Sequence, residues 1–329
     1  MNKWLPFELH THTVHSDGKH TLLEMAEKAR ELEITGIALT DHNTMSGLMD
    51  KEEVMAKTGV YILSGLEWTT FYGHMVTLGI SGYADWRNLS PLDIHKGIAN
   101  VHKQGGLAGI AHPFEIGSPI CTGCFWEYQI SDWNDVDYIE VWSETFPSIR
   151  KKNKRAYDLW IDKLNDGYRI SGTSGRDWHV SSKNKETIAL TYLNILEKND
   201  VNDKSMIDAL KKGRLSITMG PLITLDIVDE QGKSYSIGDE IEKAPFENHF
   251  KLKINVDFSV RKNQWKLDKQ DLKIRVRSNC GILEESRLRN NTLKCNTKLE
   301  NVSWVIAELH GVIEGVYTMI GFTNPIYLK

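Results

Sequence analysis

The chain has 329 residues, of which 40% are hydrophobic and 26% are charged, with a formal net charge of −4 and a pI near 6.3. This composition is typical of a folded, water-soluble protein, and the length suggests two domains. The slightly negative charge offers no attractive field for DNA or RNA, which argues against a large nucleic acid as partner but is compatible with a nucleotide-sized substrate.

The first eight residues contain no apolar core long enough for a signal peptide, and no run in the chain approaches the roughly 18 apolar residues of a membrane span. We therefore expect a cytoplasmic protein without a membrane partner. The four cysteines are expected to be reduced thiols in that compartment. Cys121 and Cys124 have the spacing of zinc ligands, but no second cysteine pair lies within the usual distance, so we interpret them as an unligated loop feature.

Up to about residue 218, short apolar runs alternate with amphipathic segments, which indicates βα units. Thr21-Leu22-Leu23-Glu24 is a capping box that predicts the start of the first helix. Further helices are predicted over 91–104, with Pro91 in the first turn, and over roughly 148–165. The predicted strands after the first helix cover 36–40, 60–66, 74–80, 106–111, 136–142, 168–172 and 172–176. Such alternation favours a barrel of parallel strands with an active site at its mouth.

From about residue 219 the apolar residues alternate with period two, and clusters of Asn, Asp and Gly separate the runs. Strands are predicted over 222–228, 250–256, 272–277 and 304–309. We therefore expect two closely packed domains, a barrel over 1–218 and an antiparallel β-sandwich over 219–329.

His10-Thr11-His12 is the most informative motif. Two histidines spaced i, i+2 on a strand project to the same face, so both imidazoles can reach one metal ion. Ten of the twelve histidines lie in the first 179 residues. Since a buried imidazole needs partners for its polar nitrogens, this concentration favours metal coordination.

Nine residues at or near the ends of predicted strands are candidate metal ligands: His10, His12, Asp17, His42, Glu67, His74, His112, Asp177 and His179. Six imidazoles and three carboxylates are too many for one ion, so two or three metals are expected, with Glu67 suited to bridge. Ligation by nitrogen and oxygen without thiolate favours Zn, Mn or Fe.

These motifs, in this order, resemble those of the PHP (polymerase and histidinol phosphatase) family over roughly residues 7–218. The segment after 219, with Thr218-Met219-Gly220-Pro221 at its start, resembles the branch named for carbaryl hydrolase. The resemblance implies a distorted (β/α)7 TIM-like barrel with a trinuclear metal centre. It assigns His10, His12, Glu67 and Asp177 to the first metal, Glu67, His74 and His112 to the second, and Asp17, His42 and His179 to the third.

Clustered divalent metals activate water and neutralise charge on phosphoryl oxygens. We expect Glu67 and Asp177 to be catalytic by holding a metal-bound hydroxide that attacks phosphorus. Arg176 is a candidate phosphate clamp, and His20 and Glu140 are candidate substrate contacts. Asp41 is expected to orient a ligand.

The leading hypothesis is a metal-dependent phosphoesterase acting on a small phosphorylated metabolite or nucleotide. Hydrolysis of a carboxylic ester, amide or carbamate at the same metal centre is the alternative. A catalytically silent, metal-stabilised binding module is a second alternative. The sequence contains no indication of oligomeric state.

Overall fold

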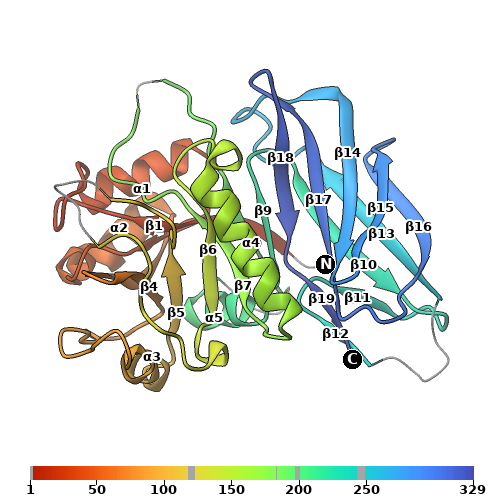
Figure 1. The fold of residues 1–329 in the computed structure, drawn as a ribbon. Coiled ribbons are helices and arrows are strands. Elements are labelled where there is room, and N and C mark those ends of the chain that lie inside the picture. The colour runs from red at the N-terminus through yellow and green to blue at the C-terminus, as the bar shows by residue number, and fades with distance from the viewer. Residues whose placement is uncertain (1–2, 118–122, 183, 197–200, 243–248) are drawn as a thin grey trace.

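The computed structural model describes residues 3–117, 123–182, 184–196, 201–242 and 249–329. It is a mixed α/β structure in which helices and strands alternate in the N-terminal part and strands alone form the C-terminal part (Figure 1). The helices are α1 (Leu22–Glu31), α2 (Lys51–Thr58), α3 (Ile94–Lys103), α4 (Lys151–Asn165) and α5 (Asp203–Lys211), with short 3-10 turns η1 (Ser46–Asp50), η2 (Trp133–Asp135) and η3 (Pro147–Ile149). None of the helices among the described residues is long and apolar enough to cross a bilayer.

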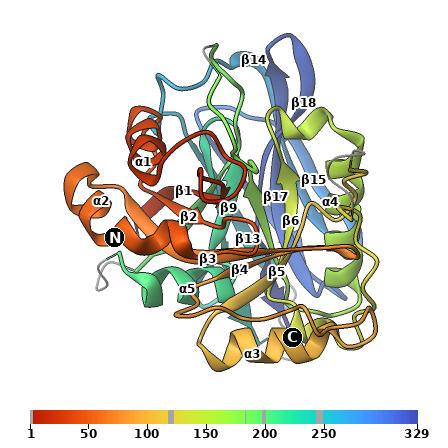
Figure 2. The same ribbon diagram turned by 90° about the vertical axis from the view of Figure 1, so that its left-hand side faces the viewer.

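The N-terminal strands are β1 (Lys3–Thr11), β2 (Gly36–Leu39), β3 (Tyr61–Thr70), β4 (Gly73–Leu78), β5 (Leu107–Ala111), β6 (Tyr138–Ser143), β7 (Ser171–Gly175), β8 (Leu190–Ile195) and β9 (Leu215–Thr218). They are hydrogen-bonded in the order β9-β8-β1-β2-β3-β4-β5-β6-β7. Figure 2 shows these strands from the side on which α1, α2, α3 and α5 surround them. The single strand β7 replaces the two strands predicted over 168–176.

The expectation of a parallel barrel is wrong at β4, and β8 and β9 are also antiparallel, since β8 pairs antiparallel with both β1 and β9. The pairs β1–β2, β2–β3, β5–β6 and β6–β7 are parallel, whereas β4 is antiparallel to both β3 and β5. The cause is the short connection after Thr70, whose hydroxyl donates to the Gly73 carbonyl oxygen and accepts from the Tyr72 amide. A tight turn of this kind joins only antiparallel strands, because a parallel pair needs a long crossover.

The predicted capping box is confirmed at α1. The Thr21 hydroxyl accepts from the Glu24 amide, and the Glu24 carboxylate accepts from the Thr21 amide. The helix predicted over 91–104 begins only at Ile94. Its expected first turn is instead closed by the Asp93 carboxylate, which accepts a hydrogen bond from the Ser90 amide at 2.6 Å.

The C-terminal strands are β10 (Leu222–Val228), β11 (Ser234–Ser236), β12 (Glu240–Ile241), β13 (His249–Asp257), β14 (Asp268–Ser278), β15 (Gly281–Arg287), β16 (Thr292–Lys298), β17 (Trp304–Ile313), β18 (Val316–Thr323) and β19 (Ile326–Leu328). Strands β11-β10-β13-β16 form one antiparallel sheet. Its apolar face, which includes Leu225 and Leu252, shares a buried core with Ile274 of β14 and Leu309 of β17. This face-to-face packing of two sheets explains the period-two pattern.

The sheet of the N-terminal part continues across residue 218, because β9 pairs with both β8 and β18. Helix α4 also joins the two parts, since it lies beside β6 and its buried Tyr157 and Trp160 pack against Phe322 of β18 (Figure 1). The two parts of the chain are therefore packed together without a gap at residues 218 and 219. The division into two domains at that position stays a prediction.

Candidate metal centre

The candidate ligands lie in or next to the strands of the N-terminal part. His10 is the next-to-last residue of β1, Glu67 lies within β3, His74 is at the start of β4, and His112 follows β5 directly. Backbone bonds align the segments: the His12 amide donates to the Trp178 carbonyl oxygen, and the Trp178 amide donates to that of His10. This register places Asp177 and His179 beside His10 of β1 and His12, which directly follows β1.

Two of these positions have strained backbone. His112 has φ of 28° and Asp177 has φ of 54°, which are unusual values for residues other than glycine. Strain of this kind persists only where the surroundings enforce it, and it concentrates at functional sites.

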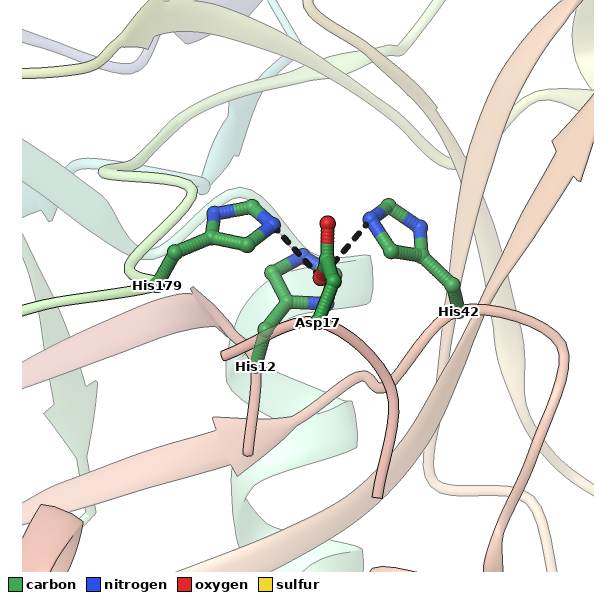
Figure 3. Close-up of side chains that lie close together, drawn as sticks. All are labelled: His12, Asp17, His42 and His179. Carbon is green, nitrogen blue, oxygen red and sulfur yellow. Dashed lines mark ion pairs between the residues drawn. The ribbon is translucent and has the colours of Figure 1, made fainter. Parts of the chain in front are cut away.

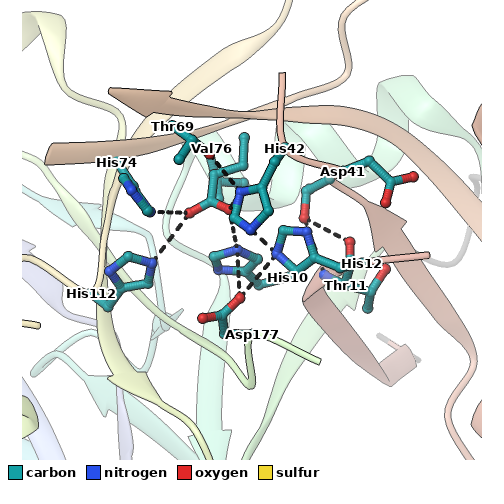
Figure 4. A network of polar contacts seen from close by, with 12 residues as sticks. His10, Thr11, His12, Asp41, His42, Thr69, His74, Val76, His112 and Asp177 are labelled. Carbon is teal, nitrogen blue, oxygen red and sulfur yellow. Dashed lines mark hydrogen bonds and ion pairs between the residues drawn. The ribbon is translucent and has the colours of Figure 1, made fainter. Parts of the chain in front are cut away.

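The first group consists of His10, His12, Glu67 and Asp177. The Nε2 atom of His10 lies 3.2 Å from Glu67 Oε2 and 3.3 Å from Asp177 Oδ1. The Nε2 atom of His12 lies 3.3 Å and 3.0 Å from the same two oxygens. Figure 4 shows the side chains of His10, His12 and Asp177 converging.

These four atoms are close to one another but are not hydrogen-bonded. Among the described residues, none of the four has a hydrogen-bond partner, although all are buried. Ligand atoms about 2.0–2.1 Å from a central ion at the corners of a tetrahedron are separated by roughly 3.3–3.4 Å. The observed separations of 3.0–3.3 Å are close to that value. The group therefore fits a metal ion at its centre.

The second group consists of Glu67, His74 and His112, and all three side chains are buried. Here the other carboxylate oxygen of Glu67 is used: Oε1 lies 3.0 Å from His74 Nδ1 and 3.2 Å from His112 Nε2. Since Oε2 faces the first group and Oε1 the second, Glu67 is placed to bridge two ions.

The third group contains His12, Asp17, His42 and His179. Asp17 Oδ1 lies 2.9 Å from His179 Nε2 and 3.4 Å from His42 Nε2 (Figure 3). His12 stacks on His42 and His179 with ring centroids 4.2 Å apart in each pair, so it adjoins this group as well as the first. The Asp17 side chain is 59% exposed, which makes this the open side of the centre.

Contacts behind the ligands fix their orientation. His10 Nδ1 lies 2.8 Å from Glu140 Oε2, and His179 Nδ1 lies 2.9 Å from the carbonyl oxygen of Asp177. A ring nitrogen that donates its hydrogen to an oxygen leaves the other nitrogen unprotonated for a metal. Both histidines therefore present Nε2 to their groups.

Asp41 acts on the loop that carries Asp17 rather than on a ligand imidazole. Its carboxylate accepts from the Thr13 amide and hydroxyl at 2.6 and 2.7 Å, and from the Ser16 hydroxyl at 2.7 Å. These bonds fix the turn in which Asp17 lies.

The charges of the ligands are strongly coupled. Burial would raise the pKa of Glu67, but the attraction of His10, His74 and His42 outweighs it and holds that pKa well below its ordinary value. For His10, burial lowers the pKa, and Glu67 and Glu140 more than reverse this, so the pKa is well above its ordinary value. A cluster that stabilises both carboxylate and imidazolium charge is suited to exchange its protons for a cation.

The predicted substrate contacts have other partners. Glu140 is buried against His10, so it positions a ligand, contrary to the expectation that it contacts substrate. His20 Nε2 accepts from the Ser181 amide at 3.1 Å. The guanidinium of Arg176 is buried 3.7 Å from the Trp178 ring centroid and within 3.4 Å of Glu186. Cys121 lies outside the described residues, and Cys124 is buried.

Two residues that contact the candidate ligands, Thr69 and Glu8, were not predicted from the sequence. Thr69 Oγ1 lies 2.5 Å from His42 Nδ1. Glu8 is buried, and its Oε1 accepts from the amides of His10 and Arg176 at 3.3 and 2.8 Å. Glu8 lies two residues before His10 on β1, so an acidic residue on the same face of the strand was the available signal.

Comparisons with known proteins identify the family of the chain. Residues 8–110 match the model of the PHP domain. An uncharacterized protein of Methanocaldococcus jannaschii is 31% identical over 125 residues, which cover 35% of this chain and 69% of that protein. A 3',5'-nucleoside bisphosphate phosphatase of Chromobacterium violaceum is 35% identical over 77 residues, which cover 22% of this chain and only 27% of that enzyme.

Among solved structures, a two-domain protein of Bacteroides vulgatus containing a "predicted PHP-like metal-dependent phosphoesterase" is similar over 99% of this chain and 96% of its own, with a TM-score of 0.55 and 15% identity. This likeness concerns the fold, including its C-terminal part. The carbaryl-hydrolase branch is not distinguished by these matches and stays a prediction. Its clustered histidines and carboxylates are placed to bind divalent metal, and the chain belongs to the PHP domain family.

Proposed function

We propose that this protein is a phosphoesterase that acts on a small phosphorylated metabolite or nucleotide, with two or three divalent ions (Zn, Mn or Fe). The observation that carries the proposal is the position of Glu67, whose two oxygens face separate groups of imidazoles at 3.0–3.3 Å. A bridged pair of ions is a common arrangement in enzymes that hydrolyse phosphoesters. The name of the bisphosphate phosphatase relative supports the same reaction class.

The proposed roles of the residues follow from their placement. Glu67, Asp177, His10 and His12 would hold one ion, Glu67, His74 and His112 a second, and Asp17, His42 and His179 a third. Bound divalent ions would supply activated water and charge neutralisation at phosphorus. Glu67 and Asp177 keep their negative charge because the surrounding imidazoles lower the pKa of each well below its ordinary value despite burial.

The substrate would approach from the side of the third group. His74 and His112 are buried, whereas the side chains of Asp17, His42 and His179 are 59%, 21% and 28% exposed. Glu140 would keep the His10 ring in place during turnover through its 2.8 Å contact with Nδ1.

A substrate panel tests the proposal. Purified protein loaded with Mn or Zn is assayed with p-nitrophenyl phosphate, bis-p-nitrophenyl phosphate and an aryl carbamate. We expect turnover of a phosphoester, loss of that turnover in His12→Ala, and no loss in the control His249→Ala, which makes the same change on β13. Turnover of the carbamate alone would refute phosphoester chemistry. If His12→Ala only lowers the melting temperature, the metals are structural.

A further inference from the structure

A hollow of about 490 Å³ lies beside the metal centre, between the segment after β7 and the segment that precedes β14. The N-terminal part lines it with residues that include His20, Arg176 and Glu186. The C-terminal part contributes Arg261 and Gln264. The hollow therefore exists only where the two parts of the chain meet.

Arg176 is 6% exposed and its charge is incompletely paired. Its Nη1 atom reaches Glu186 at 3.4 Å, but its Nε atom is 3.7 Å from the Glu8 carboxylate, too far for a hydrogen bond. Among the described residues, Nε and Nη2 of Arg176 have no hydrogen-bond partner.

Arg261 is 5% exposed, although it lies in a connecting segment. Its Nε atom donates to the carbonyl oxygen of Leu32 at 2.9 Å, which fixes the side chain against the N-terminal part. In the part of the chain that the structure describes, Nη2 has no hydrogen-bond partner, and the groups that interact with the guanidinium charge are the Tyr192 hydroxyl and the carboxylates of Glu33 and Glu8. The backbone of Arg261 has φ of 43°, a strained conformation that persists only because the surrounding contacts enforce it.

Two buried guanidinium groups with unsatisfied donors in one hollow are costly unless an anion compensates them. The described lining adds Lys28 and Lys185 against only two carboxylates, those of Glu31 and Glu186. Lys28 and Glu31 pair with each other at 2.7 Å, and Glu186 and the buried Glu8 lie within 4.0 Å of Arg176, so the positive charge that these pairs leave unbalanced is that of Arg261 and Lys185.

The hollow is close to the metal centre along three segments of the chain. Arg176 directly precedes the candidate ligand Asp177, His20 comes three residues after Asp17, and Ser181 comes two residues after His179. A second, smaller hollow of about 200 Å³ is lined by Asp177 and His179 and shares Arg176 and Glu186 with the first. The two hollows therefore adjoin each other at Arg176 and Glu186.

We propose that Arg176 and Arg261 form a subsite for a second anionic group of the substrate, a phosphate or a carboxylate, while the first phosphate is at the metal centre. This rests on the proposed function. Paired guanidinium donors suit either group, because both present several oxygens at the geometry of the guanidinium fork. The substrate class is then a small molecule with two anionic ends.

Binding of inorganic phosphate tests the subsite without turnover. Calorimetry is performed on the full chain after chelation, with wild type, Arg261→Gln and the control Lys262→Gln, which removes one charge from the neighbouring exposed position. We expect saturable binding that weakens about tenfold or more in Arg261→Gln and is unchanged in Lys262→Gln. Equal affinity in wild type and Arg261→Gln, or no binding to wild type, overturns the subsite.

Selectivity tests whether the subsite serves the substrate. Release of phosphate from fructose 6-phosphate, 6-phosphogluconate and fructose 1,6-bisphosphate is measured with metal-loaded protein. We expect kcat/KM for either 6-phosphogluconate or fructose 1,6-bisphosphate to exceed that for fructose 6-phosphate. A preference for the first identifies the second group as a carboxylate, and a preference for the second identifies it as a phosphate. This preference should fall about tenfold in Arg261→Gln and stay at the wild-type value in the control Lys262→Gln.

An unchanged preference in Arg261→Gln, or no preference in wild type, overturns the assignment to substrate. If wild type hydrolyses no phosphoester at all, the proposed function fails, and phosphate binding still decides whether the anion subsite exists. Arg261→Lys keeps the charge but loses the fork, so its affinity should lie between wild type and Arg261→Gln. An intermediate affinity of Arg261→Lys would show that the effect of Arg261→Gln comes from the lost contact with the anion. The melting temperatures of all variants show whether each of them is folded.

Discussion

The Nδ1 atom of His10 lies 2.8 Å from a carboxylate oxygen of Glu140, and both side chains are buried. The two residues are 130 positions apart, on β1 and β6. This contact fixes the ring so that Nε2 faces Glu67 and Asp177.

Glu140→Gln is expected to weaken metal binding by roughly 10- to 100-fold, because the amide retains the shape but not the charge that supports the His10 imidazole. Competition with a chromophoric chelator measures the affinity. Glu144→Gln, which alters a partly exposed carboxylate just after β6, is the control and should bind metal as wild type does. Equal affinity of Glu140→Gln and wild type would show that the contact does not support a ligand.

Metal uptake is expected to release protons. Burial lowers the pKa of His179, but Asp17 and Asp177 outweigh it and raise that pKa to about 9, and carboxylates likewise raise the pKa values of His10 and His42. His179 therefore carries a proton at neutral pH in the metal-free protein, and the raised pKa values of His10 and His42 favour their protonated forms, so metal must displace protons.

Apparent metal affinity should consequently rise as the pH increases from 6 to 9 and level off above. Calorimetry in buffers of different ionisation enthalpy counts the protons released. An affinity that is independent of pH over this range would contradict the proposed ligation by these histidines.

Gly18→Ala is expected to reduce turnover to the level of Asp17→Asn. A Cβ atom at Gly18 would lie 2.0 Å from the carbonyl oxygen of His12, so the loop that carries Asp17 must move. Steady-state kinetics compare the two variants, with Gly82→Ala, where a Cβ would meet only Gln104 Oε1 at an ordinary 3.8 Å, as a control for a Gly-to-Ala change. Wild-type turnover in Gly18→Ala would mean that the position of Asp17 is unimportant.

Trp160→Ala should lower the free energy of unfolding by about 3–5 kcal/mol, since it removes a fully buried ring. That ring packs on Phe322 and donates to the Ile170 carbonyl oxygen at 2.8 Å. Urea unfolding followed by circular dichroism measures the loss, and Leu92→Ala, at a side chain 64% exposed, should change it little.

Local features of the fold are predictable from the sequence, whereas long-range contacts are not. The capping box at Thr21 and the period-two strands need only neighbouring residues, and both are found. The reversed direction of β4 follows from the short turn after Thr70, a signal that the repeating βα pattern obscured.

The candidate ligands could be identified because their motifs lie at or near strand termini, as His10 does at the end of β1 and His112 directly after β5. The support of His10 by Glu140 could not, since it depends on the packing of β1 near β6 across the site. The presence of Arg261 in the same hollow as Arg176 could not be predicted either, because Arg261 comes from a segment 85 positions further along the chain.

The most direct test of the account is the metal content of wild type and Glu67→Ala, measured by inductively coupled plasma mass spectrometry together with phosphoester turnover. The bridging position of Glu67 predicts at least two divalent ions per wild-type chain, and loss of at least one ion and of turnover in Glu67→Ala. His249→Ala should retain both. Unchanged metal content and turnover in Glu67→Ala would contradict the proposed metal centre.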